Sequence, residues 1–168
     1  MIFVTVGTHQ QPFERLLDGI GGMPAENLVV QYGYGASPPG VARAEPFMPY
    51  VEMVRCFEQA ERVVTHAGVG SILSARRSGH VPVVVPRLKR HGEHVDDHQL
   101  ELTRALADSG HVIAVLDVTA LSEAVASAPA RGAPSGTSGS LHAALREALS
   151  APSAPQRPLQ LRDHRLRT

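Results

Sequence analysis

The sequence predicts an α/β fold in which helices cover both faces of a Rossmann-like parallel sheet. Two observations lead to this prediction. Short runs rich in valine and isoleucine recur along the chain, and segments with the apolar spacing of amphipathic helices separate them. Strands buried on both faces read as continuous apolar runs, because neither face meets water. The expected strands cover residues 2–6, 28–31, 62–65, 83–85 and 112–115, with 41–45 as a further candidate.

The helices follow from apolar spacing and from the residues that bound them. Proline suits the first helical position, so Pro12 predicts a helix start, and the pair Gly21-Gly22 ends that helix. The next helix, over 49–59, turns four residues inward, namely Tyr50, Met53, Val54 and Phe57. Three more helices are expected, from the glycine turn at 68–70 to Gly79, over 96–109 and over 141–149.

One domain accounts for most of the chain. With 168 residues, of which 43% are hydrophobic, the sequence can bury one sizeable core but not two. We expect one ligand-binding domain over 1–128, a flexible linker rich in proline, glycine and serine over 129–140, and a C-terminal helix and tail over 141–168. The tail is rich in proline and arginine, and we interpret it as a frayed terminus.

Charge and cysteine content argue against several classes of function. Sixteen basic residues balance sixteen acidic ones, so no overall field draws the chain to nucleic acid or to an anionic membrane. The single cysteine, Cys56, cannot form an internal disulfide, which fits a reducing compartment, and we expect it in the core. The amino terminus reaches Gly7 too soon for a signal peptide or a membrane span.

The most informative stretch is 63–73, Val-Val-Thr-His-Ala-Gly-Val-Gly-Ser-Ile-Leu. A β-branched run gives way to a turn of small residues and then to a helical pattern. Gly68 and Gly70 would let a ligand approach the main chain closely, while Ser71 and the first N–H groups of the helix would face it. Leu73 stands where a dinucleotide motif has its third glycine, so the turn favours an anion other than NAD, with a plain tight connection as the alternative.

Further polar loops are expected at the same edge, because ligands bind to open parallel sheets beyond the carboxyl ends of the strands. The four loops that leave the predicted strands there cover 7–11, 47–50, 66–71 and 86–99. Together they suit a sugar nucleotide. Gly7-Thr8 and the glycine turn would bind a diphosphate, and Arg87 could add charge. Phe47 and Met48 could form an apolar slot for a base, although core packing explains them equally well.

The last of these loops is long and ends in hydrogen-bonding residues. Asp96 could cap the following helix, and His98 and Gln99 could reach sugar hydroxyls. Helical spacing places Gln99 on the face of Leu102, toward the sheet. His66, in the glycine turn, is either a satisfied semi-buried histidine or a phosphate or sugar contact.

The same loop carries several side chains of the kinds that bind metals, namely His91, Glu93, His94, Asp97 and His98. Their spacing matches no strong zinc pattern, and a histidine at a helix start is more often a hydrogen-bonding residue. We therefore expect no metal.

Four motifs in order carry a resemblance to a known family. They are residues 3–9 with 12–13, then 65–72, 82–87 and 93–99. Together they closely resemble the C-terminal domain of glycosyltransferase family 28, over residues 1–116. Within this family the chain looks like the stand-alone donor-binding subunits, such as those of the two-part N-acetylglucosaminyltransferase of dolichol-linked oligosaccharide synthesis and of bacterial exopolysaccharide transferases.

The resemblance implies one half of a GT-B enzyme that binds a UDP-sugar as substrate, needs no cofactor, and transfers a hexose derivative with inversion to a lipid-linked saccharide. It also implies a membrane-associated partner subunit that carries the acceptor half, so the chain would be cytoplasmic and reach the membrane through this partner. Carried over by position, the donor site comprises Gly7, Thr8, His9, Phe47, Met48, His66, Ala67, Gly68, Val69, Gly70, Ser71, Ser74, Arg87, His98 and Gln99.

One residue departs from the family pattern. Where relatives commonly have a glutamate on the helix after the glycine turn, this chain has Ser74. A glutamate there can accept hydrogen bonds from both ribose hydroxyls, whereas serine is shorter and neutral. The alternative function is therefore a degenerate, non-catalytic donor domain that stabilises a partner transferase. The catalytic base stays unassigned, with His9 and His66 as the candidates in this chain.

Overall fold

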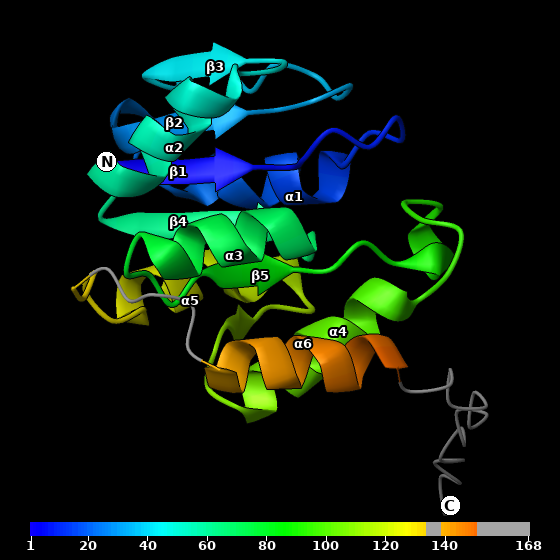
Figure 1. Cartoon of the computed structure of the whole chain (residues 1–168). Coiled ribbons are helices and arrows are strands. Elements are labelled where there is room, and N and C mark those ends of the chain that lie inside the picture. The colour runs from blue at the N-terminus through cyan, green and yellow to red at the C-terminus, as the bar shows by residue number, and fades with distance from the viewer. Residues whose placement is uncertain (134–138, 151–168) are drawn as a thin grey trace, which may run out of the picture.

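The computed structural model describes residues 1–133 and 139–150, and its centre is a six-stranded parallel sheet (Figure 1). The strands are β1 (Ile2–Thr5), β2 (Leu28–Gln31), β3 (Arg43–Glu45), β4 (Arg62–His66), β5 (Val83–Val85) and β6 (Ile113–Ala114). Their order is β3-β2-β1-β4-β5-β6, and every neighbouring pair is parallel. This is the Rossmann order, in which the chain direction across the sheet reverses between β1 and β4. The predicted fold class is confirmed, and the further candidate strand is the edge strand β3.

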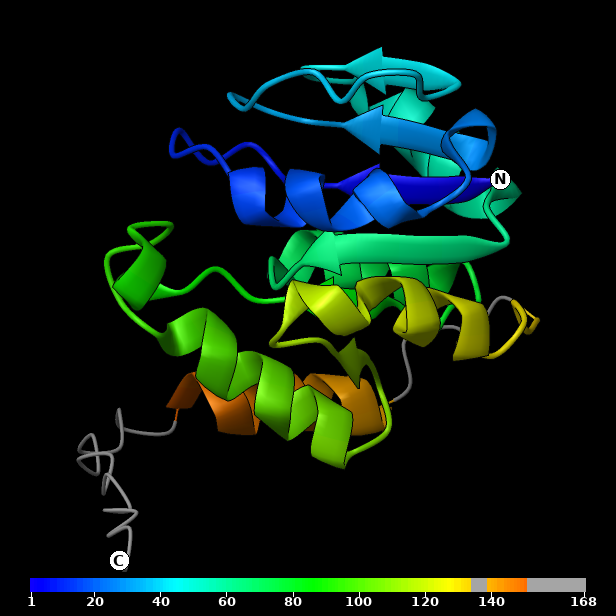
Figure 2. The ribbon, with the colours of Figure 1, turned by 180° about the vertical axis from the view of Figure 1, so that it is seen from behind.

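The helices are α1 (Glu14–Gly19), α2 (Tyr50–Gln59), α3 (Val69–Arg77), α4 (His98–Asp108), α5 (Leu121–Ser127) and α6 (Gly139–Ser150). Short 3₁₀ turns cover Ile20–Gly22, Ala25–Asn27, Lys89–His91 and Val118–Ala120. The helices α2 and α3 cover the face of the sheet seen in Figure 1, and α1 and α5 cover the opposite face (Figure 2). The arrangement leaves the carboxyl ends of the strands open between the layers.

Each face of the sheet has its own apolar core. On the α1 and α5 side, side chains of β1, β2, β4 and β5 pack against Leu16, Ile20 and Leu121. On the α2 side the rings of Phe3 and Phe57 meet edge to face at 5.0 Å between centroids. Cys56 is buried in this second core, as expected.

The helix α5 has no counterpart among the helices expected from the sequence. It continues the 3₁₀ turn Val118–Ala120, which Asp117 caps by accepting a hydrogen bond from the N–H of Thr119, and it buries Leu121 and Val125. A capping residue followed by apolar residues four apart is a helical signal, so both features were available in the sequence. Its shortness, at seven residues, is what made the periodicity weak.

The helix α6 belongs to the domain core, which differs from the expected separation after residue 128. Leu141 and Leu145 are 1% and 5% exposed, and they pack in one cluster with Leu102 and Leu106 of α4. The chain before α6 also contacts the domain, because the N–H of Gly132 donates to the carbonyl of Gly79. The remaining linker and tail, 134–138 and 151–168, lie outside the described residues.

The buried face of α6 predicts a stability effect. Replacing Leu145 with alanine removes apolar contacts and leaves a cavity beside α4, so Leu145→Ala should lower the free energy of unfolding by about 2–3 kcal/mol. Leu149 on the same helix is 64% exposed, and Leu149→Ala should cost less than about 0.5 kcal/mol. Urea denaturation of both variants measures the difference. Equal, small losses would show that α6 does not pack on α4 in solution.

Candidate functional site

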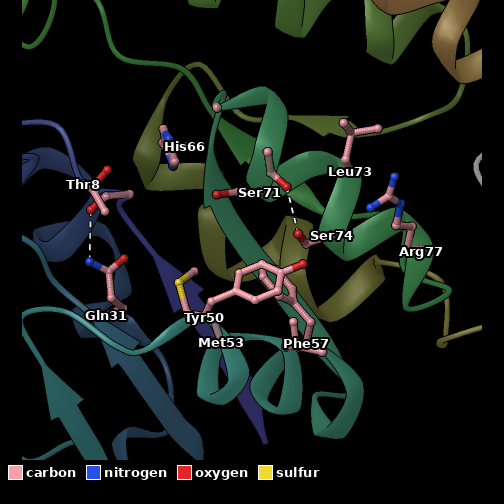
Figure 3. A pocket seen from close by; sticks show the side chains of 14 residues that line it. Thr8, Gln31, Tyr50, Met53, Phe57, His66, Ser71, Leu73, Ser74 and Arg77 are labelled. Carbon is pink, nitrogen blue, oxygen red and sulfur yellow. Dashed lines mark hydrogen bonds between the residues drawn. The ribbon is translucent and has the colours of Figure 1, made fainter.

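A cavity of about 460 Å³ opens between α2 and α3, at the carboxyl ends of β1 and β4 (Figure 3). Three parts of the chain line it. The loop after β1 and the glycine turn contribute Gly7, Thr8, His66, Gly68, Gly70 and Ser71. The helix α2 contributes Tyr50, Met53, Val54 and Phe57. The remaining lining residues are Gln31 of β2 and Leu73, Ser74 and Arg77 of α3. The cavity lies where the strand order reverses, which is the place where open parallel sheets bind ligands.

The start of α3 forms the polar end of this cavity. Gly68 precedes the helix in an extended conformation, and no side chain of the described residues caps the helix. The first N–H groups of a helix lack acceptors within the helix, and they carry the positive end of its dipole. This end of the cavity therefore suits an anion.

The glycines of the loop after β1 and of the glycine turn differ in what a side chain would contact at each position. A β-carbon added to Gly7 or Gly68 would collide with the imidazole of His66, whereas one added to Gly70 would meet nothing within 4 Å. Gly7 also has a positive φ of 78°. Gly7 and Gly68 thus make room for His66, and only Gly70 leaves its space to a ligand. Gly68 nevertheless lines the cavity, so the close approach of a ligand to its main chain stays a prediction.

His66 is held neutral between these glycines. Burial, together with the positive charge of Arg87, lowers the pKa of its imidazole to about 4. The Thr65 hydroxyl lies 3.4 Å from Nδ1 of the ring. At neutral pH the ring can exchange hydrogen bonds with a ligand but brings no charge.

Arg87 lies behind the cavity rather than in it. Its guanidinium is completely buried, rests 4.5 Å from the ring centroid of Phe13, and donates to the carbonyls of Val6, Gln11 and Pro12. These bonds hold the loop after β1. Arg87 was expected to add charge to the donor site. The structure buries it, so it does not line the cavity, and its charge acts on the nearby imidazoles of His66 and His9.

An ion pair ties the loop after β5 to α1. The Glu93 carboxylate accepts hydrogen bonds from Nε and Nη2 of Arg15, each at 2.8 Å, and from the N–H of Leu88 at 2.9 Å. Glu93 is buried, and so is Arg87. Arg15 pairs with this carboxylate, while Arg87 donates to the main-chain carbonyl of Glu93 and lies within the field of the same carboxylate. Two guanidinium groups thus share one carboxylate, and the surplus positive charge favours an anionic ligand.

A second hollow of about 470 Å³ adjoins the first, and Thr8 and His66 line both. His9, Gln10 and Gln99 complete it. The Gln99 amide oxygen accepts the N–H of Arg87 at 3.0 Å, which fixes the side chain and leaves its NH₂ group to face the hollow.

His9 and His98 differ in their relation to this second hollow. Nδ1 of His9 accepts the N–H of Gln11 at 3.2 Å, and burial and Arg87 lower the pKa of this histidine. His98 is 59% exposed and lies within 4 Å of Asp96 and Glu101 carboxylates instead. Gln99, but not His98, therefore faces the hollow.

The apolar wall of the first cavity comes from α2, not from Phe47 and Met48. Phe47 is 43% exposed and meets the ring of Tyr34 edge to face at 5.1 Å. Met48 is buried in the core beside Phe3. The inward-facing residues predicted for α2 could have indicated that this helix forms a cavity wall. Residues that line a cavity and residues that pack in a core have the same helical spacing, however, so the sequence does not distinguish them.

The other predicted residues are near the cavity. Ala67 is buried and Val69 half-buried in the glycine turn, and neither lines a hollow. The Ser74 hydroxyl lines the first cavity and donates to the carbonyl of Gly70 at 2.9 Å. Among the suspected metal ligands, His94 pairs with Asp96 at 3.0 Å and Glu93 with Arg15, and residues 1–133 and 139–150 contain no cluster of three such side chains.

The chain is similar to proteins of one known family. The Glycosyltransferase family 28 C-terminal domain matches residues 1–132. The human "UDP-N-acetylglucosamine transferase subunit ALG13" is 30% identical over 148 residues, which cover 77% of this chain and 12% of that protein. The mouse protein of the same name is 31% identical over 66% of this chain and 10% of its own length. That of Yarrowia lipolytica (strain CLIB 122 / E 150) is 29% identical over 67% of this chain and 63% of its own.

The chain thus spans only part of each of these relatives, and a small part of the two mammalian ones. The family match, however, covers most of the chain and includes every loop that lines the two hollows. The six-stranded parallel sheet is the Rossmann-like half that this family contributes to a GT-B fold. The chain belongs to the glycosyltransferase family 28 C-terminal domains.

Proposed function

We propose that this chain is the donor-binding subunit of an inverting UDP-sugar glycosyltransferase. The observation that carries the proposal is the junction of two hollows at Thr8 and His66. One hollow joins an uncapped helix start to an apolar wall, and the other offers the oriented amide of Gln99. A diphosphate at the junction, a nucleoside along α2 and a sugar beside Gln99 would fill them. The related proteins named as UDP-N-acetylglucosamine transferase subunits support this reading.

In the proposed reaction the acceptor hydroxyl attacks the anomeric carbon, and the bond to UDP breaks with its electron pair leaving on the diphosphate. The start of α3 and the buried surplus positive charge beneath the cleft would stabilise that departing anion. We therefore propose transfer without a metal and without a cofactor.

Neither candidate histidine is well placed to accept the acceptor's proton. His66 has a pKa of about 4 and is packed against Gly7 and Gly68. Nδ1 of His9 accepts a main-chain N–H, so the neutral ring carries its proton on Nε2 and acts there as a donor. We propose that the base comes from the partner subunit.

The acceptor half is proposed to belong to that partner. None of the helices in the described part of the chain is long and apolar enough to cross a membrane. A lipid-linked saccharide acceptor would then be presented by a membrane-associated subunit, and this cytoplasmic chain would meet the membrane through it. The names of the related proteins, which call them subunits, support a two-part enzyme.

A second candidate function is a degenerate donor domain that only stabilises its partner. Ser74 favours it, because its hydroxyl already donates to Gly70 and offers no carboxylate to a ribose. Binding of UDP distinguishes the two functions, since a degenerate domain would not bind it.

Gly70 provides the direct test of nucleotide binding. A valine side chain there meets no protein atom within 4 Å at its β-carbon, but it fills the space beside the helix start. Gly70→Val should keep the fold and weaken UDP binding at least about a hundredfold, as calorimetry would measure. Gly21 is equally open and far from the cavity, so Gly21→Val is the control and should bind UDP normally. Normal binding by Gly70→Val would move the diphosphate elsewhere.

Ser74 tests where the ribose lies. A carboxylate at this position would accept hydrogen bonds from the ribose hydroxyls, so Ser74→Glu should tighten UDP binding by about 1–2 kcal/mol. Ser74→Gln has similar size without the charge and should gain less. Calorimetry with UDP and 2′-deoxy-UDP measures both effects. An equal gain for the two nucleotides would contradict a ribose contact at this helix.

The partner requirement is tested by activity. The isolated chain should bind UDP-sugars but transfer no sugar to a lipid-linked acceptor, because it supplies only one half of a two-half enzyme. Adding membranes from its source should restore transfer, and Gly70→Val should then stay inactive. Robust transfer by the purified chain alone would overturn the two-subunit proposal.

A further inference from the structure

A buried side-chain amide, that of Gln31, lies at the end of β2 beside the first cavity. Gln31 is 1% exposed and lines this cavity. Its NH₂ group donates to the carbonyl of Gly7 at 3.0 Å and to the carbonyl of Pro46 at 2.8 Å. In Figure 3 the dashed line from Gln31 marks its bond to Gly7. One side chain thus joins the loop that follows β1 to the segment that follows β3.

The partners of this amide determine its orientation. Main-chain carbonyls only accept hydrogen bonds, so only the NH₂ group can face the carbonyls of Gly7 and Pro46. The amide oxygen accepts the hydroxyl proton of Thr5, and that hydroxyl in turn accepts the N–H of Gly7 at 3.2 Å. Both N–H bonds and the oxygen of the amide are therefore engaged within the protein. Gln31 can act on a ligand only through the segments that it holds.

The two segments carry different parts of the proposed donor site. Gly7 is followed by Thr8, which lines both hollows at their junction. Pro46 begins the connection 46–49 between β3 and α2, and Tyr50 in the first turn of α2 belongs to the apolar wall. The amide of Gln31 thus ties the polar junction of the site to its apolar wall.

Loss of this amide would be felt at the cavity. Without it, the carbonyls of Gly7 and Pro46 and the hydroxyl of Thr5 would lack partners, and an unpaired polar group is costly in a buried place. These groups can regain partners only if the two segments move toward water. Such a movement changes the distance between Thr8 and α2.

We propose that Gln31 is a positioning residue of the donor site, which holds Thr8 at the distance from α2 that a nucleoside diphosphate requires. This proposal rests on the proposed function. A nucleoside diphosphate must reach the junction and the apolar wall at once, so its binding depends on that distance. Gln31 itself makes no contact with the ligand.

The test is a double-mutant cycle on the full chain, with the affinity for UDP measured by calorimetry. Gln31→Met has a side chain of similar length without the hydrogen bonds, and it should weaken UDP binding at least about tenfold. Thr8→Ala should weaken binding about fivefold in wild type but less than about twofold in Gln31→Met, because Thr8 is then no longer in place. Ser71→Ala, on α3, should have the same effect in both proteins within about twofold.

Further variants separate positioning from general stability. Val125 is buried on the opposite face of the sheet, so Val125→Ala should destabilise the fold but leave UDP affinity within about twofold. Thr5→Val removes the hydroxyl between Gln31 and Gly7 and should weaken UDP about threefold, whereas Thr5→Ser keeps it and should bind normally. If Gln31→Met does not fold, Thr5→Val takes its place in the cycle.

Contrary results would distinguish this proposal from the proposed function. An equal effect of Thr8→Ala in both proteins would overturn the positioning role, because Gln31 would then not act through Thr8. Unchanged UDP affinity in Gln31→Met would overturn it as well. Both results leave the proposed function standing, since wild type still binds UDP. Failure of wild type to bind UDP would remove the proposed function and this proposal together.

Discussion

The buried guanidinium of Arg87 is the constraint on which the site depends. A fully buried cation is costly unless hydrogen bonds replace its hydration, and here the carbonyls of Val6, Gln11 and Pro12 do so. These carbonyls belong to the end of β1 and the loop that follows it, while Arg87 follows β5. One side chain therefore joins loops 75 residues or more apart in sequence and holds the mouth of both hollows in shape.

The same charge sets the character of the cleft. Burial is the larger cause of the lowered pKa of His66 and of His9, and the charge of Arg87 lowers both pKa values further. Both rings are therefore neutral near pH 7. Because Glu93 is the carboxylate that balances both Arg15 and Arg87, positive charge remains in excess. At the start of α3 the cleft can thus attract an anion through main-chain N–H groups and a buried field, while Arg77 is the cationic side chain that lines the cavity nearer the end of this helix.

The apolar packing on α2 and α6 also shapes the site. The α2 face serves at once as core, through Phe57, and as cavity wall, through Tyr50 and Met53. On the other side of α3, Leu141 and Leu145 of α6 close the core beside α4. The helix α4, whose first turn carries Gln99, is therefore supported by the last described segment of the chain, so a helix remote from the cleft helps to position it.

Local patterns in the sequence predicted the strands, the helices other than α5, and the glycine turn before α3, because strand and helix periodicity and glycine punctuation act over a few neighbouring residues. They also oriented Gln99 correctly, since helical spacing placed it with Leu102. Only the tertiary structure decided that Gly68 accommodates His66, that Arg87 is buried, and that α2 rather than Phe47 and Met48 forms the apolar wall of the first cavity. Whether a side chain meets ligand, core or solvent depends on contacts between residues far apart in sequence, and no local pattern encodes these contacts.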